Sequence, residues 1–295
     1  MKKIVIAGGT GFIGSYLKTK FEELGYTVII ISRQEKFANW NNVAAIVEAL
    51  NNAEMLINLA GKSVNCRYNE KNKREILLSR TETTKVLGEA IQQCTIPPKL
   101  WINAGTATIY RHAEDRPMTE TEGEIGNGFS VDVAKAWEKS FFNFHLKNTR
   151  QVLLRIAITL GKNEGVMKPL QNLVRFGLGG RQGSGNQMFS WIHIEDLFSI
   201  ILFIKDHSNL NGIFNCSSPN PLSNKIFMQK LRRCMNISIG LPSPAWQLKI
   251  GAVLIKTETE LVLKSRWVLP DRLLKEGYTF LYPSLDNALI NLINE

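Results

Sequence analysis

Apolar residues at the start of the chain occur first as one continuous run and then at regular intervals. Residues 3–7 read Lys-Ile-Val-Ile-Ala, which is typical of a strand buried on both faces of a parallel sheet. The apolar positions that follow lie three or four residues apart, as on one face of a helix: Ile13, Leu17, Phe21 and Leu24. Gly25 predicts the end of this helix, and the β-branched run at residues 26–31 predicts a second strand.

The alternation of strands and helices continues along the chain. Apolar runs predict strands at residues 55–60, 100–104, 152–157 and 212–216, and helical spacing predicts helices at about 69–92, 134–146 and 196–205. Ser223 or Asn224 would cap one more helix. This order predicts an α/β fold, a Rossmann doubly wound parallel sheet with a smaller C-terminal α+β domain. We place the dinucleotide-binding domain at residues 1–165 and an interleaved substrate or lid domain at residues 166–295.

The segment between the first strand and helix, Gly8–Gly14, reads Gly-Gly-Thr-Gly-Phe-Ile-Gly. In a dinucleotide-binding turn, Gly8 permits the tight turn, Gly11 lets backbone N–H groups approach a pyrophosphate, and Gly14 lets the helix lie close to the strand. The helix N-terminus also attracts negative charge. A flexible glycine turn between two core elements is the alternative, but the flanking strand and helix favour a dinucleotide.

The end of the second predicted strand indicates which dinucleotide is bound. An Asp or Glu there would accept hydrogen bonds from the ribose 2′-hydroxyl of NAD, but this chain has Ser32, Arg33 and Gln34. The guanidinium of Arg33, with the hydroxyl of Ser32, can neutralise a 2′-phosphate through charge-assisted hydrogen bonds. We therefore predict NADP(H) in preference to NAD(H). The alternative is an ordinary solvated arginine at a strand end.

The composition is that of a cytoplasmic globular enzyme. The 295 residues are 44% hydrophobic and 21% charged, enough for a substantial core. The net charge of +10 is spread along the chain without a nucleic-acid-binding motif, and the apolar N-terminal run is broken at Gly8, too early for a signal peptide or membrane span. We therefore expect no nucleic-acid or membrane partner. The cysteines have neither metal nor disulfide spacing, so we expect small core residues and no metal: Cys66, Cys94, Cys216 and Cys234.

Three segments together resemble the extended, atypical short-chain dehydrogenase/reductase superfamily of NAD-dependent epimerase/dehydratase-like proteins: Gly8–Gly14, Asn58–Gly61 and Thr106–Tyr110. Further segments are similar to the bacterial YfcH-like sugar nucleotide epimerase family: Leu154-Arg155, Phe176–Gly180, Gly183–Gln187, Ser190–Asp196 and Leu269–Leu273. The resemblance implies a site between two domains and epimerase, dehydratase or reductase activity on a small molecule. It implies these cofactor-binding residues: Gly8, Thr10, Gly11, Phe12, Ile13, Gly14, Ser32, Arg33, Leu59, Ala60 and Gly61.

The same resemblance implies a catalytic hydroxyl at Thr106, four residues before Tyr110. The superfamily's Tyr-x-x-x-Lys pair, in which the ammonium lowers the pKa of the phenol, is absent. One register of the corresponding segment places Ser130 and Ala134 at those positions, and a shift by one places Val131 and Lys135 there. Neither restores a phenol, so Tyr110 and Ser130 are the candidate substitutes. Further polar groups that could lie within reach, or simply be solvated, are Lys62, Asp132 and Lys135.

The predicted substrate segment also departs from the superfamily. Gln187 is retained, but Phe189 stands where sugar-nucleotide enzymes commonly have an arginine for the diphosphate. We therefore expect a smaller or more apolar substrate, with Lys168 and Trp191 as further candidate contacts. Other basic residues that could compensate are Arg175 and Arg181, and the glycine-rich segment 177–185 predicts either a lid or tight turns.

Two expectations remain open from the sequence. Apolar residues between Leu241 and Leu263 either pack on the cofactor domain or form a homodimer surface. His193 shares a strand face with Trp191, and we expect it to be a hydrogen-bonded structural residue. The function that we predict is that of an NADP(H)-dependent oxidoreductase or epimerase with an atypical site. The alternative is a non-catalytic NADP(H)-binding sensor or scaffold, because a fold alone does not imply activity.

Overall fold

The central sheet of the protein contains seven strands that all run parallel. The computed structural model describes residues 2–34, 36–244, 246, 248 and 263–294. The strands are β1 (Lys3–Ala7), β2 (Thr27–Ser32), β3 (Ala38–Asn39), β4 (Met55–Asn58), β5 (Leu100–Thr106), β6 (Arg150–Ile156) and β11 (Gly212–Cys216). Their spatial order is β3-β2-β1-β4-β5-β6-β11, so the direction of winding reverses beside β1. This is the doubly wound arrangement that binds ligands at the carboxyl ends of the strands.

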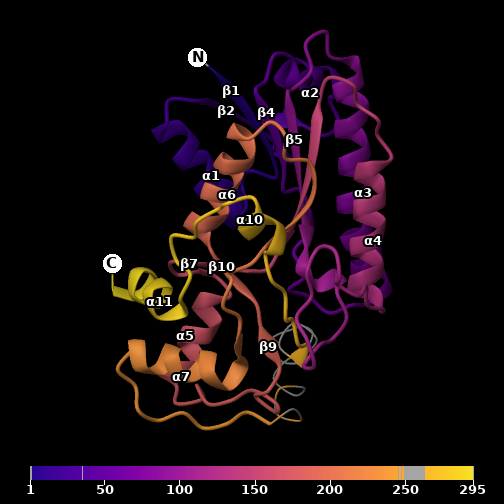
Figure 1. Ribbon diagram of the computed structural model, residues 1–295. Helices are drawn as coiled ribbons and strands as arrows, with labels where there is room; N and C mark the ends of the chain where they lie inside the picture. The colour runs from indigo at the N-terminus through magenta and orange to yellow at the C-terminus, as the bar shows by residue number, and fades with distance from the viewer. Residues whose placement is uncertain (1, 35, 245, 247, 249–262, 295) are drawn as a thin grey trace.

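Helices cover both faces of this sheet (Figure 1). Helices α1 (Phe12–Glu23) and α6 (Ile194–Asp206) pack on one face, where Phe21 and Leu197 join the core formed by β1. Helices α2 (Val43–Leu50), α3 (Glu70–Gln93) and α4 (Phe129–Phe142) cover the other face, where α3 and α4 lie side by side. The strands are mostly apolar because both faces of the sheet are covered.

A second lobe lies below the carboxyl edge of the sheet in Figure 1. It contains β7 (Ile158–Gly161), β8 (Glu164–Gly165) and β10 (Trp191–His193) in one sheet, and β9 (Met188–Phe189) with β12 (Leu222–Ser223) in another. Its core lies between helices α5 (Met167–Arg175), α7 (Asn224–Cys234) and α11 (Leu285–Asn294). The chain returns to the first sheet through α6 and β11, and helix α10 (Asp271–Lys275) then packs against β11.

The structure confirms the predicted fold class and most of the predicted elements, with local corrections. Gly25 ends α1 with a φ of +80°, and the N–H of Tyr26 donates to the carbonyl of Phe21 (3.0 Å), a typical Schellman ending. Leu24, predicted on the buried face, is 54% exposed because it lies at the C-cap. Ser223 occupies the N-cap of α7, but its hydroxyl makes no capping hydrogen bond.

Three further sequence expectations are settled or fall outside the described residues. Of the four cysteines, all unpaired, only Cys216 is fully buried, and the others are half-buried. Most of the apolar segment from Leu241 to Leu263 lies outside the described residues. Among the described helices, none combines the length and the apolar composition needed to cross a bilayer.

Candidate functional site

The glycine turn between β1 and α1 can only be built from glycines at two positions. Gly8 has a φ of +76°, and a Cβ there would lie 2.8 Å from the backbone nitrogen of Ala60. A Cβ at Gly14 would lie 2.6 Å from Cα of Gly9, so any side chain would push α1 away from the turn. The turn therefore brings the start of α1 directly against the end of β4.

The N-terminus of α1 has the features of an anion-binding site. Gly11 is its N-cap, and no side chain of the described chain caps the first turn. The nearest atom to a Cβ at Gly11 would be the carbonyl oxygen of Gly8, 3.7 Å away, so the approach to the helix end is open. Uncapped N–H groups with the positive end of the helix dipole fit the pyrophosphate of a dinucleotide.

The end of β2 lies beside this turn because β1 and β2 are paired, with Ala7 opposite Ile31. The Ser32 hydroxyl is buried and accepts a hydrogen bond from the N–H of Gln34 (3.0 Å). Arg33 is exposed, and its carbonyl accepts a hydrogen bond from Asn39 Nδ2 (3.2 Å). Its backbone is thus held while its guanidinium reaches into solvent at the edge where a ribose would lie.

A buried polar network fixes the end of β4. Asn58 Nδ2 donates to Asn103 Oδ1 (2.6 Å) and to Thr84 Oγ1 (3.1 Å), while Asn58 Oδ1 accepts from the N–H of Ala60 (3.0 Å). Trp137 Nε1 donates to the same Thr84 hydroxyl (3.1 Å). The network joins β4, β5, α3 and α4, and it places Ala60 and the following residue at the carboxyl edge.

A cavity of about 130 Å³ opens at this edge, between β5, α3 and α4. Thr106 and Ser130 both line it, and so does Ala134 one helical turn beyond Ser130. Val131 is instead buried in the core and Lys135 is exposed. Of the two registers, the one that aligns Ser130 and Ala134 with the absent Tyr and Lys therefore faces the cavity.

Family models and relatives agree with this geometry. A model of the NAD dependent epimerase/dehydratase family matches residues 4–217, and a model of a domain of unknown function, DUF1731, matches residues 243–292. The chain belongs to the NAD dependent epimerase/dehydratase family. An epimerase family protein of Staphylococcus epidermidis is 32% identical over an alignment of 302 positions that covers 99% of each chain.

Solved structures of similar proteins extend the comparison. The structure of human epimerase family protein SDR39U1 (isoform 2), determined with NADPH, has a TM-score of 0.90 and 28% identity, and the match covers 99% of each chain. A nucleoside-diphosphate sugar epimerase of Corynebacterium glutamicum has a TM-score of 0.80 and 27% identity over 100% of this chain and 59% of its own. The chain is thus similar over its whole length to extended short-chain dehydrogenase/reductase proteins.

In this family member, Tyr110 lies in the interior and does not line the cavity. Its hydroxyl donates to Asn215 Oδ1 (2.9 Å) and accepts from Arg155 Nη1 (2.8 Å), and burial raises the pKa of the phenol. Arg155 in turn forms a buried two-pronged pair with Glu138, at 2.8 Å for both contacts. These contacts give Tyr110 a structural role. Its position in the interior does not support a role as the substitute acid.

The predicted substrate residues do not converge on the cavity. Gln187 is buried, and its side chain binds the carbonyl of Gln182 (2.8 Å) inside its own loop. Trp191 lies in the core of the second lobe, and Lys168 is exposed on the outer face of α5. Phe189 packs on Phe227 with ring centroids 4.3 Å apart, so it is part of the same core.

The remaining polar candidates have local partners. Lys62 Nζ donates to Asn72 Oδ1 (2.7 Å) and forms an ion pair with Glu75. Asp132 and Lys135 face one another 3.9 Å apart on the surface of α4. The exposed Arg175 and Arg181 bind groups within their own segments, at Asn172 and Ser184. Among the described residues, no cluster of three or more His, Cys, Asp or Glu could hold a metal.

Two arginines were missed by the sequence reasoning, the half-buried Arg80 and the buried Arg266. Arg80 of α3 lines the cavity, and Arg266 reaches it indirectly, because its Nε donates to the hydroxyl of Thr108 (3.1 Å), another residue of the cavity wall. The sequence signal available for Arg80 was its place on the predicted helix that follows the β4 edge. Arg266 had no comparable signal, because it lies 158 positions from Thr108.

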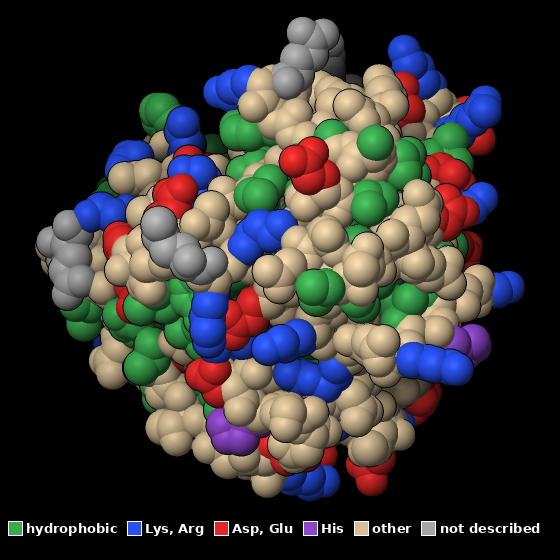
Figure 2. Space-filling model, turned by 90° about the horizontal axis from the view of Figure 1, so that it is seen from above, with side chains coloured by type: hydrophobic (Ala, Val, Ile, Leu, Met, Phe, Trp, Pro, Cys, Tyr) green, Lys and Arg blue, Asp and Glu red, His purple; other side chains and the backbone are tan. Residues whose placement is uncertain are grey.

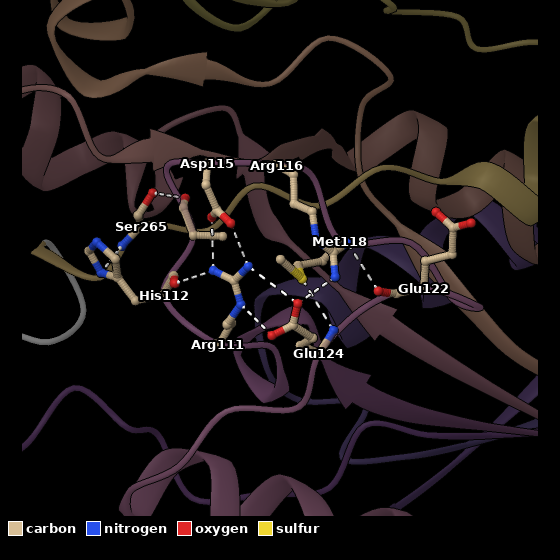
Figure 3. Close-up of polar contacts among 9 residues, drawn as sticks. Arg111, His112, Asp115, Arg116, Met118, Glu122, Glu124 and Ser265 are labelled. Carbon is tan, nitrogen blue, oxygen red and sulfur yellow. Dashed lines mark hydrogen bonds and ion pairs between the residues drawn. The ribbon is translucent and has the colours of Figure 1, made fainter.

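The loop that connects Thr106 to Ser130 is fastened by charged groups. Figure 3 shows the guanidinium of Arg111 between two carboxylates, with Nη2 2.7 Å from Asp115 and Nε 2.9 Å from Glu124. Ser265, far along the chain, donates its hydroxyl to the carbonyl of Ala113 (2.6 Å) and its N–H to His112 Nδ1 (3.1 Å). The C-terminal part of the chain thus holds the loop that follows Thr106.

Proposed function

We propose that the protein is an NADP(H)-dependent oxidoreductase of epimerase/dehydratase type, acting on a small molecule in the cavity beside Thr106. The observation that carries the proposal is the carboxyl edge of the sheet. There the uncapped start of α1 lies beside a strand end that presents Arg33 instead of a carboxylate. The NADPH in the structure of the human relative supports the same cofactor.

The residues of the edge suit this cofactor in their chemistry. The N–H groups that follow Gly11 would hold the pyrophosphate, and Arg33 with Ser32 would hold a 2′-phosphate. The backbone from Leu59 to Gly61 would lie under the nicotinamide end, since the Asn58 network holds it at the strand end. A bound nicotinamide cofactor supplies or accepts the hydride.

The chain's own contribution at the reacting oxygen comes from two hydroxyls. The Thr106 oxygen accepts a hydrogen bond from the N–H of Thr108 (3.1 Å), so its own O–H is available to donate to a substrate oxygen. Ser130 approaches the same cavity from α4. The walls formed by Phe129 and Trp137 exclude water and strengthen these hydrogen bonds.

Arg33 decides cofactor preference in this proposal. We expect wild-type protein to bind NADPH more tightly than NADH, and Arg33→Gln to weaken NADPH binding by about tenfold to a hundredfold with little change for NADH, because a charged contact to the 2′-phosphate is lost. Isothermal titration calorimetry measures all four affinities. Arg175→Gln, an exposed arginine of α5, is the matched control. Equal binding of both cofactors by the wild type would refute the assignment.

The second candidate function is a non-catalytic NADP(H)-binding sensor, which the Ser130 and Ala134 pair favours because neither side chain replaces a phenol and an ammonium. The two functions separate when NADPH-loaded protein is offered aldehydes, ketones and sugar nucleotides while cofactor absorbance and product isomers are followed. Turnover that falls in Thr106→Val with NADPH binding unchanged supports the enzyme. Tight NADPH binding with no turnover of the panel supports the sensor.

A further inference from the structure

Arg80 lies in the wall of the cavity in an environment built around its guanidinium. A Cβ at Gly61 would lie 3.1 Å from its Cζ, so the guanidinium packs closely over this glycine. On its other side, Cζ lies 5.2 Å from the ring centroid of Trp137. Its Nη1 donates to the carbonyls of Lys62 (3.1 Å) and Ile76 (3.0 Å), which fixes the plane of the group.

The remaining donors of this guanidinium have no partner. Across the described ranges, Nε and Nη2 of Arg80 make no hydrogen bond, and no carboxylate lies within ion-pair distance of it. Arg155, by contrast, is buried and paired with Glu138. Burial lowers the pKa of Arg80 to about 10, so the group still carries its charge at neutral pH. Arg80 is half-buried, and an unpaired charge that is partly withdrawn from water is costly, so an anion would offset that cost.

The cavity limits the size and chemistry of such an anion. The described residues that line it are apolar apart from Arg80 and four residues with hydroxyl groups, Tyr68, Thr106, Thr108 and Ser130. A volume of about 130 Å³ corresponds to roughly four water molecules at about 30 Å³ each. This is room for a planar carboxylate with a few attached atoms. Phe189, which stands where sugar-nucleotide enzymes commonly have an arginine for the diphosphate, packs on Phe227 in the core of the second lobe.

We propose that Arg80 binds the carboxylate of the substrate, and that the substrate class is therefore a small carboxylic acid. The inference rests on the proposed function, because it places this acid beside the hydroxyls of Thr106 and Ser130. A guanidinium matches a carboxylate through two parallel N–H donors, and here Nε and Nη2 are the pair left unused. Arg80 thus determines specificity, and the hydroxyls hold the oxygen that reacts.

The test compares carboxylates with their neutral amides, in protein with and without saturating NADPH. Malonate and oxamate are titrated against malonamide and oxamide by calorimetry and by thermal unfolding. We expect both carboxylates to bind and to raise the melting temperature, and neither amide to do so. Inorganic phosphate is a separate arm. Binding of phosphate as tight as that of malonate would show an unselective anion site and overturn the proposal, as would an absence of carboxylate binding.

Variants assign the effect to Arg80. Arg80→Gln should weaken malonate binding by about tenfold to a hundredfold. The malonate affinity of Arg80→Lys should lie between those of the wild type and Arg80→Gln, because lysine keeps the charge but lacks the two parallel N–H donors. Arg74→Gln removes an exposed arginine from the same helix and should change nothing. Unchanged malonate affinity in folded Arg80→Gln overturns the proposal. If that variant does not fold, Arg80→Lys and the amide comparison decide. Failure of the wild type to bind NADPH would instead refute the proposed function, while the cofactor-free titrations still test Arg80.

Discussion

Two glycines, one before α1 and one after it, have nearly the same φ angle but different surroundings. Gly8 has a φ of +76° and Gly25 a φ of +80°, a region that side chains rarely adopt. A Cβ added at Gly25 would have nothing within 4 Å, whereas one added at Gly8 would meet backbone atoms of Leu59 and Ala60 at 2.8 Å. The pair therefore separates the effect of backbone strain from that of a steric clash.

We expect Gly25→Ala to lower the free energy of unfolding by about 1 kcal/mol through backbone strain alone. Gly8→Ala should lower it by roughly 3 kcal/mol or more, since the clash involves backbone that cannot turn away, and it should abolish NADPH binding. Urea denaturation and calorimetry measure both effects. Similar losses of stability in the two variants would contradict the close approach between the turn and β4.

At the scale of elements, the junction of β10 and α6 is held by a histidine. His193 is fully buried, caps α6 by accepting the N–H of Glu195 at Nδ1 (3.2 Å), and stacks on Tyr282 with ring centroids 3.9 Å apart. The structural role predicted for it from the strand pattern agrees with this place. It also lines a hollow of about 740 Å³, which runs along α1 and includes Thr10, Gly11 and Phe12 of the glycine turn.

Burial lowers the pKa of His193 from 6.5 to about 4. The unfolded chain takes up this proton near pH 6.5 and the folded protein only near pH 4, so the stability due to the neutral ring is complete above pH 6.5 and is lost as the pH falls to 4. The linked loss is about 3 kcal/mol. Urea denaturation at both pH values should show that His193→Asn, which retains an acceptor for the cap, loses this part of the pH dependence. The exposed His145→Asn should keep it.

Elements with a clear sequence pattern were predicted well, but the contacts between elements were not predicted. The strands β1, β4 and β6 are buried on both faces and read as continuous apolar runs, and Gly25 ended its helix as expected. Short elements such as α2 and α5 were missed because eight or nine residues give a weak periodic signal. Arg80 became a candidate only when α3 packed against Gly61, since residue spacing carries no information about that contact.

At the scale of the whole molecule, one buried chain of polar contacts joins distant parts of the fold. It runs from Glu138 of α4 through Arg155 of β6 and Tyr110 to Asn215 of β11, whose Nδ2 donates to the carbonyl of Leu269 (3.0 Å). Sequence reasoning could not link Tyr110 to Asn215, because they are 105 positions apart. This chain of hydrogen bonds therefore connects residues from both halves of the sequence.

We expect Tyr110→Phe to lower the free energy of unfolding by about 1–3 kcal/mol, because Arg155 and Asn215 each lose a buried partner. The matched control is Tyr16→Phe, since the Tyr16 hydroxyl is buried with no hydrogen-bond partner among the described residues and its removal should be neutral or stabilising. Thermal and urea unfolding measure both. A fully stable Tyr110→Phe protein with abolished turnover would restore Tyr110 as the proton donor.

The charged side chains on the face shown in Figure 2 do not form an ordered network. Figure 2 shows Lys and Arg side chains interspersed there with Asp and Glu and with apolar residues. The net charge of +10 is therefore not gathered into one basic patch on this face. Local pairs such as Lys18 with Glu22 (2.8 Å) on α1 are solvated contacts of small energetic weight.

The late return of the chain to its first sheet has a consequence for biosynthesis. Strand β11 pairs with β6, but 55 positions of sequence separate Ile156 from Gly212, and they build α5, β10 and α6 in between. A nascent chain that has left the ribosome only as far as α5 holds six strands of the central sheet and an open edge along β6. Such an edge can pair with another polypeptide. Once the chain has been translated through Cys216, β11 can pair with β6 and cover this open edge.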